Sequence, residues 1–220
     1  MADIPSAERL RVIEVYASIQ GESTFAGLPC VFVRLAGCNL RCTWCDSTWT
    51  FKGGEPRSID DVVAEVAGFG IGLVEVTGGE PLVHRQAIPL MERLLAAGHT
   101  VLLETSGSRD IGPVPSGVHV ILDLKPPDSG EERANLWANI PKLKPIDEVK
   151  FVLASRRDYE WARDVVAREG LAARCTVLFS VAFGHVAAAD VVEWMLADKV
   201  PARFQVQMHK VIWPPEQRGV

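Results

Sequence analysis

The chain alternates short β-like segments with longer helical patterns, and this order restricts its possible folds more than any other feature. Runs rich in β-branched or apolar residues predict strands at 11–15, 30–35, 72–77, 100–104, 119–124, 148–153, 174–179 and 204–207. Apolar residues at helical spacing predict helices at 59–67, 86–97, 157–168 and 185–197. Because strands that alternate with helices usually pair in parallel, the pattern predicts an α/β fold with mostly parallel strands.

The length of 220 residues limits how many strand–helix units the sheet can hold. A complete barrel of eight such units needs about 250 residues. Six units, some with shortened helices, predict a partial (β/α)6-type barrel whose open side is closed by a loop, a ligand or another subunit. The sequence has no internal repeat, low-complexity segment or linker, so we expect one domain over residues 1–220.

Composition and charge exclude several classes of partner. The chain is 48% hydrophobic and 23% charged, as in soluble globular proteins with a sizeable core. Its apolar runs are shorter than the roughly 20 residues that span a bilayer, so we expect no membrane insertion. The net charge of -5 argues against a general nucleic-acid surface. With no secretory signal at the N-terminus, the sequence predicts a cytoplasmic protein that acts on a small molecule.

Three cysteines lie close together after the second predicted strand. Cys38, Cys42 and Cys45 are separated by three and then two residues. Iron–sulfur clusters in electron carriers normally take four cysteines, so three predict a cluster with one iron open to a small molecule. Structural zinc is a weaker alternative, because a closed zinc site needs four ligands. The five cysteines are an odd number, which argues against a disulfide framework, and Cys30 and Cys175 are expected to be buried, inert thiols.

Four unusual loops follow consecutive predicted strands. They are the cysteine segment at 38–45, Thr-Gly-Gly-Glu-Pro at 77–81, Glu-Thr-Ser-Gly at 104–107 and Asp-Leu-Lys-Pro at 123–126. In βα barrels the carboxyl ends of the strands carry the active site. A Gly-Gly-Glu-Pro sequence alone could be only a turn. Four such loops at one rim of the sheet predict a common site.

The Cys-x3-Cys-x2-Cys segment and the downstream Thr-Gly-Gly-Glu-Pro together resemble the radical S-adenosylmethionine (SAM) superfamily. Within it, the chain resembles the 7-carboxy-7-deazaguanine synthase family in segments 18–22, 32–40, 45–47, 104–107 and 205–210. This resemblance runs nearly end to end and implies a radical SAM partial barrel. It also implies a carbon–nitrogen lyase that converts 6-carboxy-5,6,7,8-tetrahydropterin into 7-carboxy-7-deazaguanine and ammonia, in queuosine and 7-deazapurine biosynthesis.

The resemblance implies three cofactors: a [4Fe-4S] cluster, SAM and Mg²⁺. The cluster would be held by Cys38, Cys42 and Cys45, and SAM would chelate the remaining iron. The residues expected to contact SAM are Trp44, Cys45, Asp46, Gly78, Gly79, Glu80, Glu104, Asp123, Lys125 and Ser180. Ser47 matches the position of a Mg²⁺ ligand, although without the resemblance a capping or turn role is favoured. For Trp44 the alternative is ordinary aromatic packing.

The substrate contacts implied by the resemblance are Ile19, Gln20, Gly21, Arg34, Thr77 and the C-terminal Val220. Arg34 could pair with the substrate carboxylate or with a structural carboxylate, and its neighbours leave both open. His209 and Lys210 are expected behind the site or in a structural role. The resemblance adds no catalytic side chain beyond the cluster and SAM. It implies a homodimer and an electron donor such as flavodoxin or ferredoxin.

Two other functions stay open from the residues. A glycyl-radical enzyme activase shares the cysteine and glycine motifs but acts on a protein backbone. A non-catalytic binding module could use the same cysteines to hold zinc or a cluster. The Gln-Gly-Glu sequence at 20–22 and Gln-Met-His-Lys at 207–210 favour the synthase.

Overall fold

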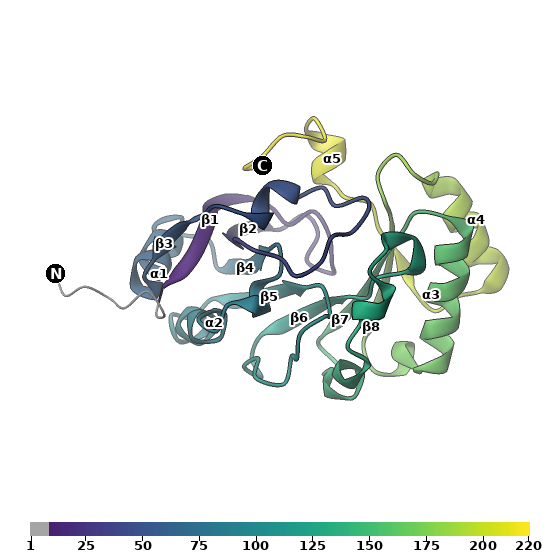
Figure 1. Ribbon diagram of the computed structural model, residues 1–220, viewed down its shortest axis with the longest axis horizontal. Helices are drawn as coiled ribbons and strands as arrows, with labels where there is room; N and C mark the ends of the chain where they lie inside the picture. The colour runs from purple at the N-terminus through teal and green to yellow at the C-terminus, as the bar shows by residue number, and fades with distance from the viewer. Residues whose placement is uncertain (1–8) are drawn as a thin grey trace.

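The computed structural model describes residues 9–220, and its main feature is one curved sheet of nine strands (Figure 1). The strands are β1 Leu10–Ile19, β2 Pro29–Leu35, β3 Glu55–Arg57, β4 Leu73–Gly78, β5 Thr100–Thr105, β6 His119–Asp123, β7 Glu148–Leu153, β8 Thr176–Val181 and β9 Arg203–Phe204. Their order across the sheet is β3-β1-β2-β4-β5-β6-β7-β8-β9. All pairs from β2 to β9 are parallel. The predicted α/β class with a mostly parallel, open sheet is therefore confirmed.

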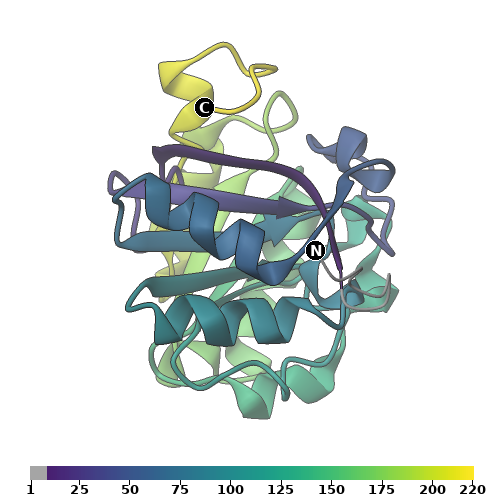
Figure 2. The same cartoon turned by 90° about the vertical axis from the view of Figure 1, so that its left-hand side faces the viewer.

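Within the described part of the chain, four helices cover the outer face of the sheet: α1 Ile59–Gly68, α2 Ala87–Ala96, α3 Arg156–Arg168 and α4 Ala188–Asp198. The short α5 His209–Ile212 lies beside the C-terminal segment instead (Figure 1). Figure 1 places α1 and α2 at one end and α3 and α4 at the other, and Figure 2 views the α1–α2 end. Ser58 caps the start of α1, because its Oγ accepts a 3.1 Å hydrogen bond from the Asp61 backbone N–H. Among residues 9–220, none of the helices is long and apolar enough to cross a membrane.

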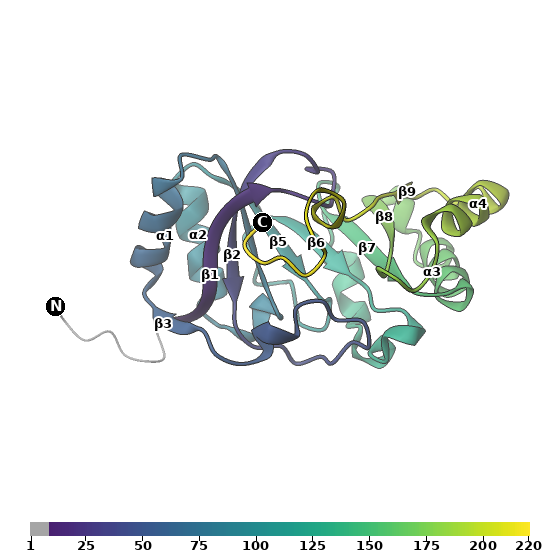
Figure 3. The same ribbon diagram turned by 90° about the horizontal axis from the view of Figure 1, so that it is seen from above.

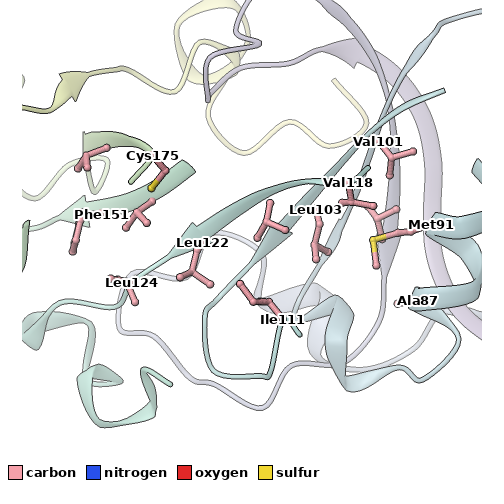
Figure 4. Close-up of a cluster of buried hydrophobic side chains, with 14 of the residues drawn as sticks. Ala87, Met91, Val101, Leu103, Ile111, Val118, Leu122, Leu124, Phe151 and Cys175 are labelled. Atoms are coloured by element: carbon pink, nitrogen blue, oxygen red, sulfur yellow. The ribbon is translucent and has the colours of Figure 1, made fainter. Parts of the chain in front are cut away.

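Side chains on the parallel strands alternate between a dry outer core and a partly polar inner face. Valine, leucine and phenylalanine side chains pack outward against the helices; Figure 4 shows part of this core, including Met91, Leu103, Leu122 and Phe151. The inward side chains near the amino ends of the strands form a smaller apolar group: Cys30, Phe32, Leu73, Leu102 and Ile121. Further along the strands they are polar: Arg34, Glu75, Thr77, Glu104, Asp123 and Lys150. The alternation therefore turns the inner face at the carboxyl ends into a polar surface.

The ends of the sheet differ from the sequence-based prediction. The first strand spans Leu10–Ile19 instead of 11–15, and it pairs antiparallel with β2 because only a loop joins them. The short edge strand β3 contains Pro56 and was not predicted. The last strand covers Arg203–Phe204 instead of 204–207. Helix α4 begins at Ala188, three residues after the predicted start.

Candidate functional site

A cavity of about 300 Å³ lies where the parallel strands end, and the C-terminal segment 215–220 forms part of its wall. Figures 1 and 3 place this segment, in yellow, above the strands. The predicted site residues that line the cavity are Ile19, Gln20, Gly21, Arg34, Cys38, Cys42, Trp44, Cys45, Asp46, Ser47, Thr77, Gly78, Gly79, Glu104, Asp123, Lys125 and Val220. Glu80 and Ser180 do not reach its surface. The structure thus brings together loops that are far apart in the sequence, as we expected from their position at the carboxyl ends of neighbouring strands.

The cysteine loop is fastened on both sides. Gly37 N–H donates to Thr50 O at 2.7 Å, and Thr43 N–H donates to Ser129 O at 3.0 Å. The guanidinium of Arg41 donates to the carbonyls of Cys38 and Leu40 at 2.9 and 2.6 Å. These bonds present three thiols to one cavity without a disulfide between them.

The thiols fit a metal cluster better than a single ion. Burial raises the pKa of Cys42 to about 11 and also raises those of Cys38 and Cys45, so binding iron must displace their protons. Among residues 9–220, no three His, Cys, Asp or Glu side chains converge as a single metal ion requires. Each cysteine of a [4Fe-4S] cluster binds a different iron, so that convergence is not needed.

The Thr-Gly-Gly-Glu-Pro loop packs directly on the cysteine loop. A Cβ on Gly79 would lie 2.7 Å from Cys38 Cβ and closer still to Gly37 O, so only glycine fits. Gly78 has φ +148° and passes just as closely to Leu35. Glu80 is fully buried, and its carboxylate accepts hydrogen bonds from Ser106 N–H at 2.7 Å and Thr105 Oγ1 at 3.0 Å. Glu80 therefore joins the loops after β4 and β5 from behind the cavity.

Asp46 and Ser47 lie at the end of the cysteine loop, beneath α5. Ser47 Oγ donates to Asp46 Oδ1 at 2.9 Å, and Lys210 Nζ donates to Asp46 Oδ2 at 2.7 Å. Although burial works in the other direction, the Lys210 ammonium lowers the pKa of Asp46 to about 2. The Lys210–Asp46 pair thus fastens the C-terminal segment to the cysteine loop.

Replacing Lys210 with methionine is expected to weaken this attachment and change the acid sensitivity of the fold. Asp46 titrates near 3.8 when unfolded and near 2 when folded, so its contribution is present above about pH 4 and lost as the pH falls toward 2. Because the Asp46 side chain is half exposed, we expect a loss of about 1 kcal/mol at neutral pH. Urea unfolding at several pH values measures it, and a difference between the two proteins that stays constant from pH 5 to pH 2 would contradict this role.

A group of charged residues forms the inner floor of the cavity. Lys150 Nζ lies 2.5 Å from Glu104 Oε1 and 3.0 Å from Glu22 Oε2. Asp123 pairs with Lys125 at 2.8 Å. Burial raises the pKa of Glu75 to about 7 and that of Glu104 to about 8. Sequence reasoning missed Lys150, Glu22 and Glu75. The available signal was a charged residue inside an otherwise apolar strand, as Glu75 is in Leu-Val-Glu-Val-Thr-Gly at 73–78.

Two side chains predicted to bind the substrate, those of Arg34 and Gln20, already have hydrogen-bond partners within the protein. Arg34 donates to Glu14 Oε1 at 2.8 Å and to the Tyr16 hydroxyl at 2.7 Å, so the structural-carboxylate alternative is realised. The amide of Gln20 donates to Glu75, and His209 lies against Gly21. A substrate role for Arg34 stays a prediction.

Two buried polar atoms near the cavity are unsatisfied. Asp123 Oδ1 and Ser180 Oγ have no hydrogen-bond partner among residues 9–220. Buried polar groups are nearly always paired. The free oxygen of Asp123, which lines the cavity, thus fits a polar ligand such as the amino or hydroxyl groups of SAM.

Comparison with known proteins agrees with this geometry. The sequence model of the radical SAM superfamily matches residues 33–126. The chain is 46% identical to a 7-carboxy-7-deazaguanine synthase of Koribacter versatilis, over 96% of this chain and 100% of that protein. It is 42% identical to that of Chlorobaculum tepidum, over 96% and 97% of the two chains. The crystal structure of QueE from Escherichia coli superposes with a TM-score of 0.74 at 24% identity, over 91% of this chain and 95% of that one, which supports the fold.

Proposed function

Because the chain belongs to the 7-carboxy-7-deazaguanine synthase family of radical SAM enzymes, we propose that it converts 6-carboxy-5,6,7,8-tetrahydropterin into 7-carboxy-7-deazaguanine and ammonia. The observation that carries this proposal is one cavity of about 300 Å³ that is lined both by three free thiols and by a group of charged residues. That volume lies at the lower end of the range for small-molecule sites and suits a small bicyclic substrate. Family membership disfavours both the activase and the non-catalytic binding module.

Membership in this family implies a [4Fe-4S] cluster, SAM and Mg²⁺, and the residues present fit these groups. Cys38, Cys42 and Cys45 would hold the cluster, which with bound SAM supplies the radical that starts the reaction. Around SAM we propose Trp44, Cys45, Asp46, Gly78, Gly79, Glu80, Glu104, Asp123, Lys125 and Ser180. Ser47 would contribute one hydroxyl to Mg²⁺, whose other ligands would be water and substrate oxygens. Of this set, Glu80 and Ser180 would need a rearrangement to touch SAM, because neither reaches the cavity.

The chain's own residues bind and orient the pterin. Ile19, Gln20, Gly21 and Thr77 would offer backbone and amide groups to its edge, and Arg34 could extend its donors from Glu14 to the substrate carboxylate. Val220 lines the same cavity. Arg218 lies over the Trp49 ring at 4.5 Å, which holds the C-terminal segment across the opening and helps exclude water.

The surroundings of the enzyme are also part of the proposal. An exposed cluster needs a reducing compartment, which supports a cytoplasmic enzyme that receives electrons from a small donor such as flavodoxin or ferredoxin. The open side of the sheet supports a homodimer. The continuous sheet supports a single domain over residues 1–220, of which residues 1–8 lie outside the described part.

Anaerobic turnover tests the proposed reaction. With reconstituted enzyme, dithionite, SAM, Mg²⁺ and the tetrahydropterin, we expect several molecules of 7-carboxy-7-deazaguanine for each SAM, measured by chromatography and mass spectrometry. Enzyme that has not been reconstituted with iron is the control and should give none. Formation of 5′-deoxyadenosine without the deazapurine would contradict the proposed substrate.

A further inference from the structure

The floor of the cavity is organised around one buried ammonium group. Lys150 comes from the middle of β7, and its side chain is 7% exposed. Its Nζ lies 3.0 Å from Glu22 Oε2, 2.5 Å from Glu104 Oε1 and 3.9 Å from Asp123 Oδ2. These carboxylates belong to the loop after β1, to β5 and to β6. One cation therefore holds acidic groups from three other parts of the fold.

Carboxyl groups outnumber ammonium groups at this point. Lys125 pairs with Asp123, which leaves Lys150 facing Glu22, Glu104 and the more distant Glu75. Concentrating buried carboxylates is unfavourable for stability, so a purely structural explanation is weak. The side chains of Glu104 and Glu22 are 21% and 17% exposed, whereas that of Lys150 is 7% exposed. The two glutamate side chains are thus more accessible from the cavity than the lysine side chain is.

We propose that Lys150 is a positioning residue that arranges the acidic floor, Glu22 above all, to accept hydrogen bonds from the N–H groups of the pterin. This inference rests on the proposed function. A pterin has an exocyclic amino group and ring N–H groups along one edge, and a carboxylate is the acceptor that matches such paired donors.

The contacts of Glu22 fix its orientation for this task. Its Oε2 accepts from Lys150, and its Oε1 accepts from Gln207 Nε2 at 2.9 Å. Each carboxylate oxygen has two lone pairs, so both can still accept from a ligand. Burial would favour the protonated form of Glu22, but Lys150 and Gln207 lower its pKa and keep it a carboxylate.

Removing the Lys150 ammonium is expected to change the pH range in which the acidic floor can bind the pterin. The charged or titratable groups around this ammonium are Glu22, Glu75, Glu104, Asp123, Lys125 and His209. Without Lys150, burial and repulsion from the neighbouring carboxylates raise the pKa of Glu22, so it is protonated at neutral pH and accepts the N–H donors poorly. Raising the pH ionises it again.

Binding of 6-carboxytetrahydropterin to the reconstituted full chain, with saturating SAM and no reductant, tests this inference by anaerobic calorimetry. We expect Lys150→Met to raise Kd about 30-fold near pH 7, as for the loss of paired charge-assisted hydrogen bonds, and part of this loss to be recovered near pH 9. Lys150→Arg should retain most of the affinity. Lys142→Met, at a partly exposed pair with Asp110, is the matched control and should bind as the wild type does.

The outcomes separate the two proposals. Unchanged affinity and pH dependence in Lys150→Met would overturn the role of Lys150 while the proposed substrate stands. A wild-type enzyme that does not bind the pterin would overturn both. If Lys150→Met does not fold, the double variant Lys150→Met/Glu104→Gln removes one charge of each sign. It should bind about 30-fold more weakly than the wild type, and wild-type affinity would again overturn the inference.

Discussion

Replacing Cys42 with alanine is expected to abolish both iron retention and product formation. Cys42 is the central thiol of a loop that presents Cys38, Cys42 and Cys45 to one cavity. With one thiol removed, a second iron of the cluster would have no protein ligand, and the remaining two cysteines could not orient it. Iron content and visible absorption after anaerobic reconstitution measure the first effect, and the turnover assay measures the second.

A second cysteine distinguishes this effect from the general loss of a buried thiol. Cys175 is also buried, but it belongs to the hydrophobic core away from the cavity. Cys175→Ala should keep wild-type iron content and turnover, with a stability loss of about 1 kcal/mol from the vacated space. Wild-type iron content in Cys42→Ala would contradict the assignment of the thiols.

The interior of the sheet could be predicted from the sequence because local pattern and burial agree there. Segments such as 30–35 and 148–153 are almost entirely buried and rich in apolar residues, so they read as short strands. The first strand was predicted too short, and its antiparallel pairing was not foreseen. The segment 16–19, which the prediction missed, contains Ala17 and Ser18 in place of the β-branched residues that mark a strand. Pairing direction depends on the connection, which residue propensity does not encode.

The rim of the site was predictable for a different reason. Parallel strands place the loops that follow them at one edge of the sheet. A motif that directly follows a strand must therefore lie near the motifs that follow the adjacent strands. Side-chain direction was not fixed in this way. Glu80 stands in a rim loop, yet its carboxylate turns behind the cavity because Ser106 and Thr105 offer donors there. The sequence does not show these donors as neighbours of Glu80.

The floor of the cavity was missed because its partners are distant in the chain. Lys150 and Glu22 are separated by 128 positions, and Lys150 belongs to no motif, while the Gln-Gly-Glu sequence at 20–22 does not reveal that Glu22 faces a lysine. A lone lysine in an apolar strand indicates only that a partner must exist. Identifying that partner requires the three-dimensional fold, in which the loop after β1 contacts β7 through the hydrogen bond from Thr24 N–H to Glu148.

Replacing Gly79 with alanine is expected to destabilise the fold and to disturb the cysteine loop together. The backbone of Gly79 lies so close to this loop that an added Cβ would approach Cys38 Cβ to 2.7 Å. The contact is with backbone and a Cβ, which cannot rotate away, so one of the two loops must move. We expect a loss of about 3 kcal/mol in the free energy of unfolding, at the upper end for overpacking. Urea unfolding of the iron-free chain and iron content after reconstitution measure the two effects.

Gly98→Ala is the matched control for this change. Gly98 has φ +88°, but an added Cβ there would meet no atom within 4 Å. That substitution should cost about 1 kcal/mol from the left-handed backbone alone and leave the iron content unchanged. The difference between the two variants isolates the contact between the glycine loop and the cysteine loop. If Gly79→Ala lost no more stability than Gly98→Ala and retained full iron, the close packing of these loops would not be what holds the thiols in place.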